Sequence, residues 1–244
     1  LRTLPQELAT RVARHLVVVA ELLDVDPELA YKHAKAVRDR ASRVAVAREA
    51  AGLAAYATGR YAEALAELRA FTRMSGSHEH LAEMADCERG LGRPEKALEL
   101  AASPAAQGLE PDSRAELLIV ASGARRDLGQ HEAAVVVLAG PELKSRSRAP
   151  WVARLRYAYA DALLAAGRED DAREWFARAA EIDDDGVTDA EERLAALEGV
   201  DFLTEADDLM EPEVDLTEDD DNGVTDEQPT SGEQSAPTDA PDPS

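Results

Sequence analysis

The sequence predicts an all-α protein: a right-handed solenoid of about five antiparallel helix hairpins, a C-terminal capping helix and a disordered acidic tail. Three observations lead to this fold class. First, the good helix formers Ala, Leu, Arg and Glu dominate a chain of 244 residues that is only 4 % aromatic. Second, a pattern of glycine and small residues recurs about every 34 residues. Third, the last 46 residues are acidic and poor in large apolar side chains.

Four glycines anchor the repeat. Gly59, Gly92, Gly129 and Gly167 are 33, 37 and 38 residues apart. A small residue stands seven positions before each glycine: Gly52, Ala85, Ser122 and Ala160. An alanine stands five positions after each: Ala64, Ala97, Ala134 and Ala172. The residues nine positions after the glycines are Leu68, Ala101, Leu138 and Phe176.

These residue types at these offsets are typical of a helical hairpin. Glycine tolerates the left-handed conformation that ends the first helix. The small residues let the two paired helices approach closely, and a large residue nine positions after the turn packs into the next unit. Because one hairpin cannot bury its apolar face alone, we expect the units to stack into a solenoid.

Both ends of the array carry their own signals. At the start, two amphipathic helices flank a turn in which Val25 replaces the glycine, and Pro27 stands at a favoured first helical position. After the last unit, residues 188–198 predict a short helix capped by Thr188 or Asp189. We expect this helix to cover the open end of the solenoid.

Over residues 45–182 the pattern resembles the tetratricopeptide repeat (TPR) family, and we expect a member of bacterial type. The best matching units are Tyr159–Ala180 and Gly52–Leu68. Pro104 and Pro141 stand where the family would continue the second helix of a hairpin. The resemblance therefore implies two short second helices.

The resemblance also implies that the first helices line a concave groove that binds a protein or peptide segment. The family's geometry places ten candidate partner-binding residues in this groove: Glu49, Tyr56, Glu79, Asp86, Arg89, Glu116, Arg126, Arg154, Tyr157 and Asp161. Tyr and Arg are residue types enriched in binding hot spots. One branch of the family binds chaperone C termini through Lys and Asn. We do not expect that here, because the groove positions hold neither residue.

Composition divides the chain into a helical repeat domain, residues 1–198, and an acidic tail, residues 199–244. The tail holds sixteen Asp and Glu and no Lys or Arg, which leaves −7 of the net charge of −23 for the domain. Such a tail cannot bury enough apolar surface to offset the entropy of ordering, so we predict disorder. Within it, Asp201–Leu216 mixes acids with large apolar residues and could fold on a partner.

Catalytic and metal-binding motifs are scarce. The chain has no phosphate-binding loop and no nucleophile elbow. His78–His80 lacks the H-E-x-x-H spacing, and we interpret it as a solvated loop and helix cap. Acids flank Cys87, which favours the unreactive thiol. We therefore predict no catalytic residue, cofactor or metal; for an enzyme, Asp86, Glu79 and His80 are the least implausible residues.

The sequence thus predicts a non-enzymatic adaptor or scaffold for protein–protein interaction. A second hypothesis stays open, in which the tail regulates polyanion binding, to nucleic acid or an acidic partner, at Lys and Arg clusters within residues 32–48 and 144–156. Nucleic acid is the less favoured partner because these clusters have few interleaved aromatics.

The sequence also carries expectations about location. Its apolar stretches fall far short of the ~20 residues that span a bilayer, so we expect no membrane partner. The single cysteine, Cys87, suits a reducing compartment, and we expect a cytoplasmic protein. The identity of the partner and the oligomeric state are not predicted.

Overall fold

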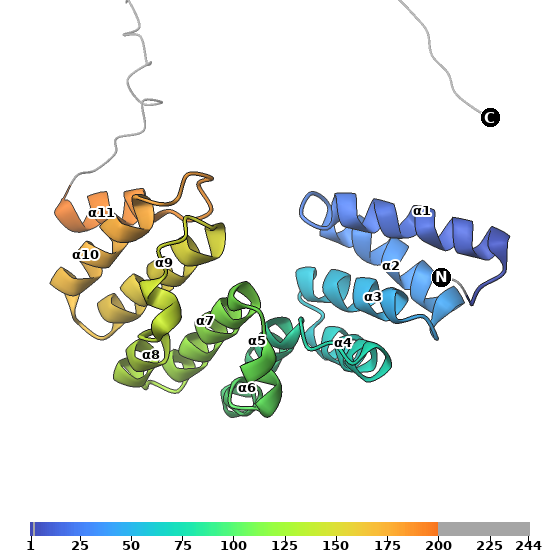
Figure 1. Ribbon diagram of the computed structural model, residues 1–244, viewed down its shortest axis with the longest axis horizontal. Coiled ribbons are helices and arrows are strands. Elements are labelled where there is room, and N and C mark those ends of the chain that lie inside the picture. Colours follow the sequence, from blue (N-terminus) through green and yellow to red (C-terminus); the bar gives the residue numbers. More distant parts are fainter. Residues whose placement is uncertain (2, 200–244) are drawn as a thin grey trace, which may run out of the picture. The chain divides into compact units, whose positions relative to one another are not determined.

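The computed structural model describes residue 1 and residues 3–199, which are all-α (Figure 1). No strand occurs among these residues, and none of their helices is long and apolar enough to cross a membrane. The predicted disordered tail, residues 199–244, lies outside the described residues except for Gly199. The helices are α1 (Gln6–Leu22), α2 (Pro27–Ala41), α3 (Ala45–Ala57), α4 (Tyr61–Ser75), α5 (Leu81–Gly90), α6 (Pro94–Ala101), α7 (Pro111–Asp127), α8 (His131–Leu138), α9 (Pro150–Ala165), α10 (Glu169–Ala180) and α11 (Ala190–Glu198).

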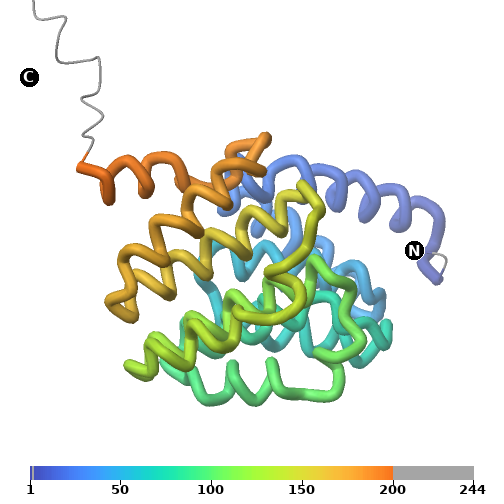
Figure 2. Tube along the Cα trace, turned by 60° about the vertical axis from the view of Figure 1, so that its left-hand side comes forward, coloured from blue at the N-terminus to red at the C-terminus, as the bar shows by residue number. Residues whose placement is uncertain are grey.

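The first ten helices pair into five antiparallel hairpins, α1 with α2 through to α9 with α10, as the sequence predicted (Figure 1). Each second helix also packs against the first helix of the next hairpin. The first helices α3, α5, α7 and α9 contact one another in order. The last helix, α11, packs on α10 and covers the end of the stack, which confirms the predicted capping helix (Figure 2).

The four repeated glycines end their helices in the same way. Gly59, Gly92, Gly129 and Gly167 all have positive φ, between 71° and 75°. The residue after each glycine donates its backbone N–H to the carbonyl five positions earlier, at 2.8 to 2.9 Å. This closure satisfies carbonyls that the helix end would otherwise leave unpaired, and a left-handed residue makes it possible. The predicted turns are therefore confirmed.

The small residues before the turns set how closely the paired helices approach. A Cβ atom on Gly52 would lie 2.6 Å from the side chain of Leu68, so α3 and α4 could not pack this closely around a larger residue. Ser122 takes the same position in α7, where its hydroxyl donates to the carbonyl of Ala134 in α8 at 3.1 Å. Close packing within the hairpins is thus specified locally by residue size.

Two hairpins have short second helices, as the prolines predicted. Helices α6 and α8 have 8 residues each, compared with 15 in α4 and 12 in α10. The chain then forms 3-10 helices that begin at the prolines, Pro104–Gly108 and Pro141–Lys144. The longer α10 brings the fully buried Phe176 against α9, and the fifth hairpin therefore has a substantial aromatic core.

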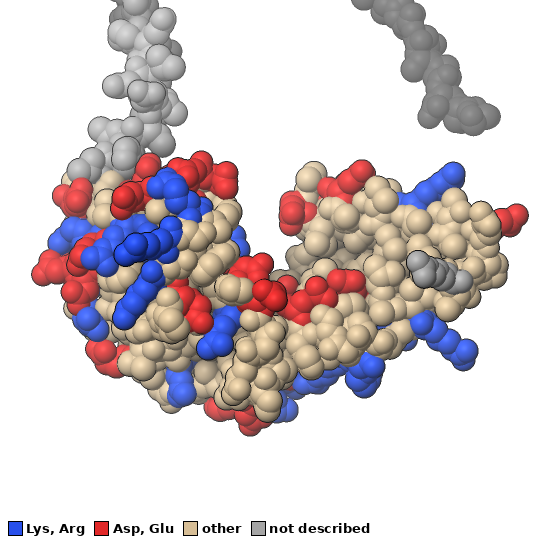
Figure 3. Space-filling model, in the orientation of Figure 1, with Lys and Arg blue, Asp and Glu red and all other residues tan. Residues whose placement is uncertain are grey.

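Charged side chains are unevenly spread over the domain. On the face shown in Figure 3, acidic side chains gather in the middle, beside α3 and α5. Lys and Arg side chains gather over α9 on the same face. A ligand that reaches this face therefore meets a different electrostatic environment in the middle of the stack than at its C-terminal end.

Candidate functional site

Polar side chains on the first helices pair from one hairpin to the next. The Tyr56 hydroxyl on α3 donates to Oδ2 of Asp86 on α5 at 2.9 Å. Oδ1 of Asp86 accepts from Nη1 of Arg89 at 2.8 Å. Arg89 also donates to Asp127 on α7, through Nε at 2.8 Å and Nη2 at 3.2 Å. One network therefore links three consecutive first helices.

Two further ion pairs join α7 to α9. Nη1 of Arg126 donates to Oδ2 of Asp161 at 2.5 Å, and Oδ1 of Asp161 accepts from Arg193 on α11 at 3.0 Å. Arg154 on α9 donates to Oε1 of Glu116 on α7 through Nε at 2.7 Å. These side chains are 26 to 40 % exposed, so each pair is screened and contributes less than about 1 kcal/mol. Their main effect is to hold the arginines in position.

At the other end of the same surface, His80 joins α3 to α5. Its Nε2 lies 3.0 Å from Oε1 of Glu49 and its Nδ1 lies 3.5 Å from Oε1 of Glu83, while only 12 % of its side chain is exposed. Burial alone would lower the pKa of His80, but the hydrogen bonds to Glu83 and Glu49 raise it to about 9. The imidazole is therefore protonated at neutral pH and serves as a cation between two carboxylates.

The structure corrects two expectations about residues 78–80. The repeat pattern placed Glu79 on a first helix, but α5 begins at Leu81, and Glu79 lies exposed in the preceding turn. There its carboxylate accepts from the hydroxyl of Ser77 at 2.7 Å. The segment between α4 and α5 displaces the helix start, and a fixed offset from the turn glycine cannot show this. The interpretation as a solvated loop is also wrong for His80, which is largely buried.

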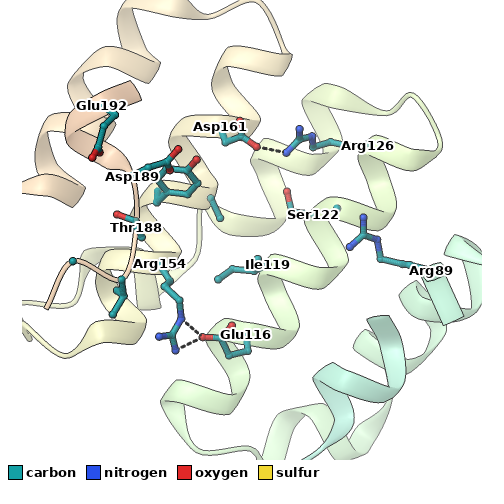
Figure 4. A pocket seen from close by; sticks show the side chains of 15 residues that line it. Arg89, Glu116, Ile119, Ser122, Arg126, Arg154, Asp161, Thr188, Asp189 and Glu192 are labelled. Atoms are coloured by element: carbon teal, nitrogen blue, oxygen red, sulfur yellow. Dashed lines mark hydrogen bonds and ion pairs between the residues drawn. The ribbon is translucent and has the colours of Figure 1, made fainter. Parts of the chain in front are cut away.

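A cavity of about 660 Å³ lies between α7, α9 and the segment that precedes α11 (Figure 4). This volume is within the range of about 300–1,000 Å³ that is typical of ligand sites. Its walls include six of the ten predicted partner-binding residues: Arg89, Glu116, Arg126, Arg154, Tyr157 and Asp161. The stack thus forms a hollow at its C-terminal end that can admit the side chains of a bound segment.

The floor of this cavity is largely apolar. Ile119 of α7 and Tyr157 and Ala158 of α9 contribute to it. The ring of Tyr157 packs edge-on against the buried Phe176, with 5.4 Å between the ring centroids. Burial, together with the nearby Asp189 carboxylate, raises the pKa of Tyr157 to about 12. The hydroxyl therefore stays neutral, and the floor offers apolar surface with one polar group.

One wall of the cavity comes from a part of the chain that the sequence analysis did not assign to the site. This wall is formed by Gly186–Asp189 and Glu192. The carboxylate of Asp183 orders the loop, because it accepts the backbone N–H groups of Val187 and Thr188, both at 2.8 Å. It also accepts the Thr188 hydroxyl at 2.6 Å. The stretch D-D-D-G-V-T could have indicated an ordered turn, but not the surface that it faces.

The other four predicted residues lie on the same surface but outside this cavity. Tyr56 and Asp86 belong to the network that adjoins it through Arg89. Glu49 lies beside His80, and Glu79 lies in the turn before α5. Partner binding by any of the ten residues stays a prediction. The pattern missed the contributions of Arg193, Asp189 and Glu192, since α11 and the loop before it are not part of the repeat.

The described part of this surface offers binding groups rather than an activated nucleophile. Cys87 is buried, and burial raises the pKa of its thiol to about 12. Ligand-type atoms of Glu49, Glu79 and His80 lie within 4.8 Å of one another, a separation that would suit a metal ion. The protonated His80 opposes a cation there, because a metal needs the neutral imidazole.

Solved structures share this arrangement of hairpins. Two crystal structures of a putative kinesin light chain from Podosopora anserina, described as having nearly identical TPR-like repeats, match the chain with TM-scores of 0.54 and, for a form with one substitution, 0.55. The fold is TPR-like. The two matches cover 72 % and 70 % of this chain and 97 % and 94 % of the others, at 18 % sequence identity. At that identity the likeness concerns the TPR-like fold alone. No known protein family and no curated protein matches the sequence.

Proposed function

We propose that this TPR-like chain is a non-enzymatic adaptor or scaffold that binds a segment of a partner protein along the first helices. The observation that carries the proposal is the cavity of about 660 Å³ on the faces of α7 and α9, closed on one side by the loop before α11. A bound segment places side chains in this cavity while its backbone follows the row of first helices. The Tyr56–Asp86 network would then lie further along its path.

Long side chains around the cavity are already held in place. Arg89, Arg126 and Arg154 each bridge neighbouring first helices through ion pairs. A side chain that is ordered beforehand loses less rotamer entropy when a partner binds. Arg and Tyr are also residue types that contribute most to binding energy in interfaces. A preordered row of this kind supports a protein ligand.

The charge of the cavity supports a protein partner rather than nucleic acid. A nucleic-acid site needs an excess of cations to neutralise phosphates. The cavity instead has one more acid than base, since its charged residues are Glu116, Asp161, Asp189, Glu192, Arg89, Arg126 and Arg154. Polyanion binding at the Lys and Arg clusters outside the cavity remains the alternative prediction.

We assign this function to residues 1–198 and treat residues 199–244 as a separate acidic tail, as the composition indicates. We also propose a cytoplasmic location. Cys87 is a free, buried thiol, which suits a reducing compartment.

Filling the cavity tests the function directly. Ala158 lines the cavity, so Ala158→Phe should block it without removing any ion pair. The matched control is Ala66→Phe, because Ala66 is exposed on α4. Full-length wild type and both variants would be used for affinity purification with mass spectrometry, after circular dichroism shows equal helix content. We expect wild type and the control to recover the same partners and Ala158→Phe to lose them. Equal recovery by all three proteins would refute the groove as the binding site.

A further inference from the structure

The geometry points to a basic side chain, Lys or Arg, as the group that the cavity accepts. Its aliphatic stem would lie on the floor of Ile119, Tyr157 and Ala158, and its cation would face Asp189 and Glu192. This inference rests on the proposed function and specifies the chemistry of the bound segment. The charged side chains around the cavity divide into those that already form ion pairs and those that do not form them with any described residue.

All three arginines of the cavity are engaged. Arg89 uses Nε, Nη1 and Nη2 to bind Asp86 and Asp127. Arg126 pairs with Asp161, and Arg154 pairs with Glu116. An acidic ligand could recruit one of these arginines only by taking it from its carboxylate, and that carboxylate would then lose its counter-charge. The arginines therefore position the wall of the cavity and offer little net attraction to an anion.

The acids of the loop and of α11 have no counter-charge among the described residues, although the Tyr157 hydroxyl lies close to Asp189. Asp189 and Glu192 line the cavity, and neither forms an ion pair with any residue among 1 and 3–199. Both lie at the N-terminal end of α11, and this end of a helix carries a partial positive charge of about +0.5. Two full negative charges exceed that partial charge, so the local field is negative. In contrast, the charge of Asp161 is already matched by Arg126 and Arg193.

The apolar floor selects a long stem as well as a charge. Lys and Arg can bury their methylene groups on apolar surface while the charged head stays at a polar rim. Here the floor comes from α7 and α9, and the acids come from the loop and from α11 (Figure 4). A short cation would reach the acids without covering the floor, and an apolar side chain would cover the floor but leave the acids unpaired. Lys and Arg satisfy both.

The same charge balance disfavours the chain's own tail as the occupant. Residues 199–244 contain sixteen acids and no Lys or Arg. Placing such a segment against Asp189 and Glu192 would bring like charges together, which costs binding energy. The cavity therefore suits a segment from another protein that carries a basic residue.

A display selection tests this inference with defined probes. A random peptide library would be selected on the full-length chain at about 150 mM salt, where long-range attraction to the acidic tail is largely screened. The same selection would use Asp189→Asn/Glu192→Gln and, as the control, Glu95→Gln/Glu99→Gln. Glu95 and Glu99 are exposed on α6, with no ion pair among the described residues, so the control removes the same charge elsewhere. The Asp189 side chain makes no cap hydrogen bond, and Asn is a good cap, so the fold should be retained.

We expect peptides that are enriched in Lys or Arg at one position, with wild type and with the control alike. For the best peptide, replacing that residue by norleucine should weaken binding about tenfold, and Asp189→Asn/Glu192→Gln should produce a similar loss. Peptides without a basic preference, or a preference that survives Asp189→Asn/Glu192→Gln, would overturn the inference but leave the adaptor function standing. Failure to select any peptide that Ala158→Phe excludes would count against the adaptor function itself.

Discussion

The two halves of the groove place side chains at the same helix positions but use them differently. Around α3 and α5, polar groups fill the surface by pairing with one another, as Tyr56 does with Asp86 and His80 with Glu49. Around α7 and α9, the ion pairs stand at the edges, and a cavity of about 660 Å³ is left between them. The repeat therefore provides the positions for a site, but it does not by itself make one.

The difference comes from small residues and from a segment outside the repeat. Gly123 and Ala158 line the cavity, where larger side chains would occupy its volume. A Cβ on Gly123 would lie 2.6 Å from the guanidinium of Arg89, so the glycine also makes room for the Arg89 network. The loop Gly186–Asp189 then closes one side. A regular stack thus becomes a candidate site where its regularity ends.

The largest effect should come from the core behind the cavity. Phe176 is fully buried and supports the ring of Tyr157. Phe176→Ala should lower the free energy of unfolding by about 3–5 kcal/mol and should also deform the cavity floor. Urea unfolding followed by circular dichroism measures the first effect, and the affinity for a selected peptide measures the second.

A core substitution in the other half provides the comparison. Leu68 is also fully buried, and Leu68→Ala should cost about 2–5 kcal/mol. Because Leu68 packs with residues of α3, α4 and α5 and not with α7 or α9, peptide affinity should change less than twofold under conditions where the variant is folded. If both variants weaken peptide binding equally, the peptide does not bind specifically at the cavity between α7 and α9.

Replacing one glycine by alanine in each half should affect stability in one half and peptide affinity in the other. In Gly52→Ala the new Cβ would meet the Leu68 side chain at 2.6 Å and its backbone nitrogen at 3.2 Å. Overpacking of this kind costs about 1–3 kcal/mol, against a gain of about 1 kcal/mol in helix propensity, so we expect a net loss of about 1 kcal/mol. Thermal unfolding would measure it.

Gly123→Ala is the matched substitution in the other half. Its Cβ would meet only the flexible end of Arg89, which can move aside. Stability should change by less than about 0.5 kcal/mol, while the Arg89–Asp127 pair is displaced and peptide affinity falls. A loss of stability as large as that of Gly52→Ala would show that the Arg89 network is structural rather than part of a binding surface.

Much of the fold could be predicted because its determinants act locally. Gly59 ends a helix by its own conformation, and the size of Gly52 sets a contact within the same hairpin. The start of α5 at Leu81 could not be predicted from a fixed offset, because the segment that joins one hairpin to the next differs in length along the stack. The charge of the cavity also could not be predicted from the sequence. Asp189 and Arg126 line the same cavity only because elements far apart in the chain pack together.

The half around α3 and α5 should show a pH dependence that the other half lacks. The pKa of His80 is about 9 in the folded protein, compared with 6.5 for a histidine in the unfolded chain. The protonated form is favoured by folding, so its stabilising contribution is complete below pH 6.5 and is lost between pH 6.5 and 9. After screening by solvent we expect an effect on the order of 1 kcal/mol.

Comparing wild type with His80→Gln isolates this contribution from other titrating groups. The difference in unfolding free energy should be larger at pH 6 than at pH 9.5. The carboxylates that face His80, namely Glu49 on α3, Glu83 on α5 and the neighbouring Glu79, are the same in both proteins. A difference that is constant across this range would mean that His80 is not the charged link between the second and third hairpins.

The smallest effect should come from two tyrosine hydroxyls, one in each half. Tyr56→Phe removes the hydrogen bond to Asp86, and burial together with that carboxylate raises the pKa of Tyr56. Asp86 keeps its bond from Arg89, so we expect a loss of only about 0.5–1 kcal/mol in stability, and little change in peptide affinity.

Tyr157→Phe should change peptide affinity and leave stability almost unchanged. The Tyr157 hydroxyl lies at the cavity beside the exposed Asp189, so its loss should leave stability within about 0.5 kcal/mol of wild type. It would also leave Asp189 to face a ligand cation alone, and the affinity for a Lys-containing peptide should rise slightly. Isothermal titration calorimetry on the two variants decides the matter. If Tyr56→Phe instead proves to be the variant that alters peptide binding, the partner lies mainly on the α3–α5 half, and the cavity is only the end of a longer site.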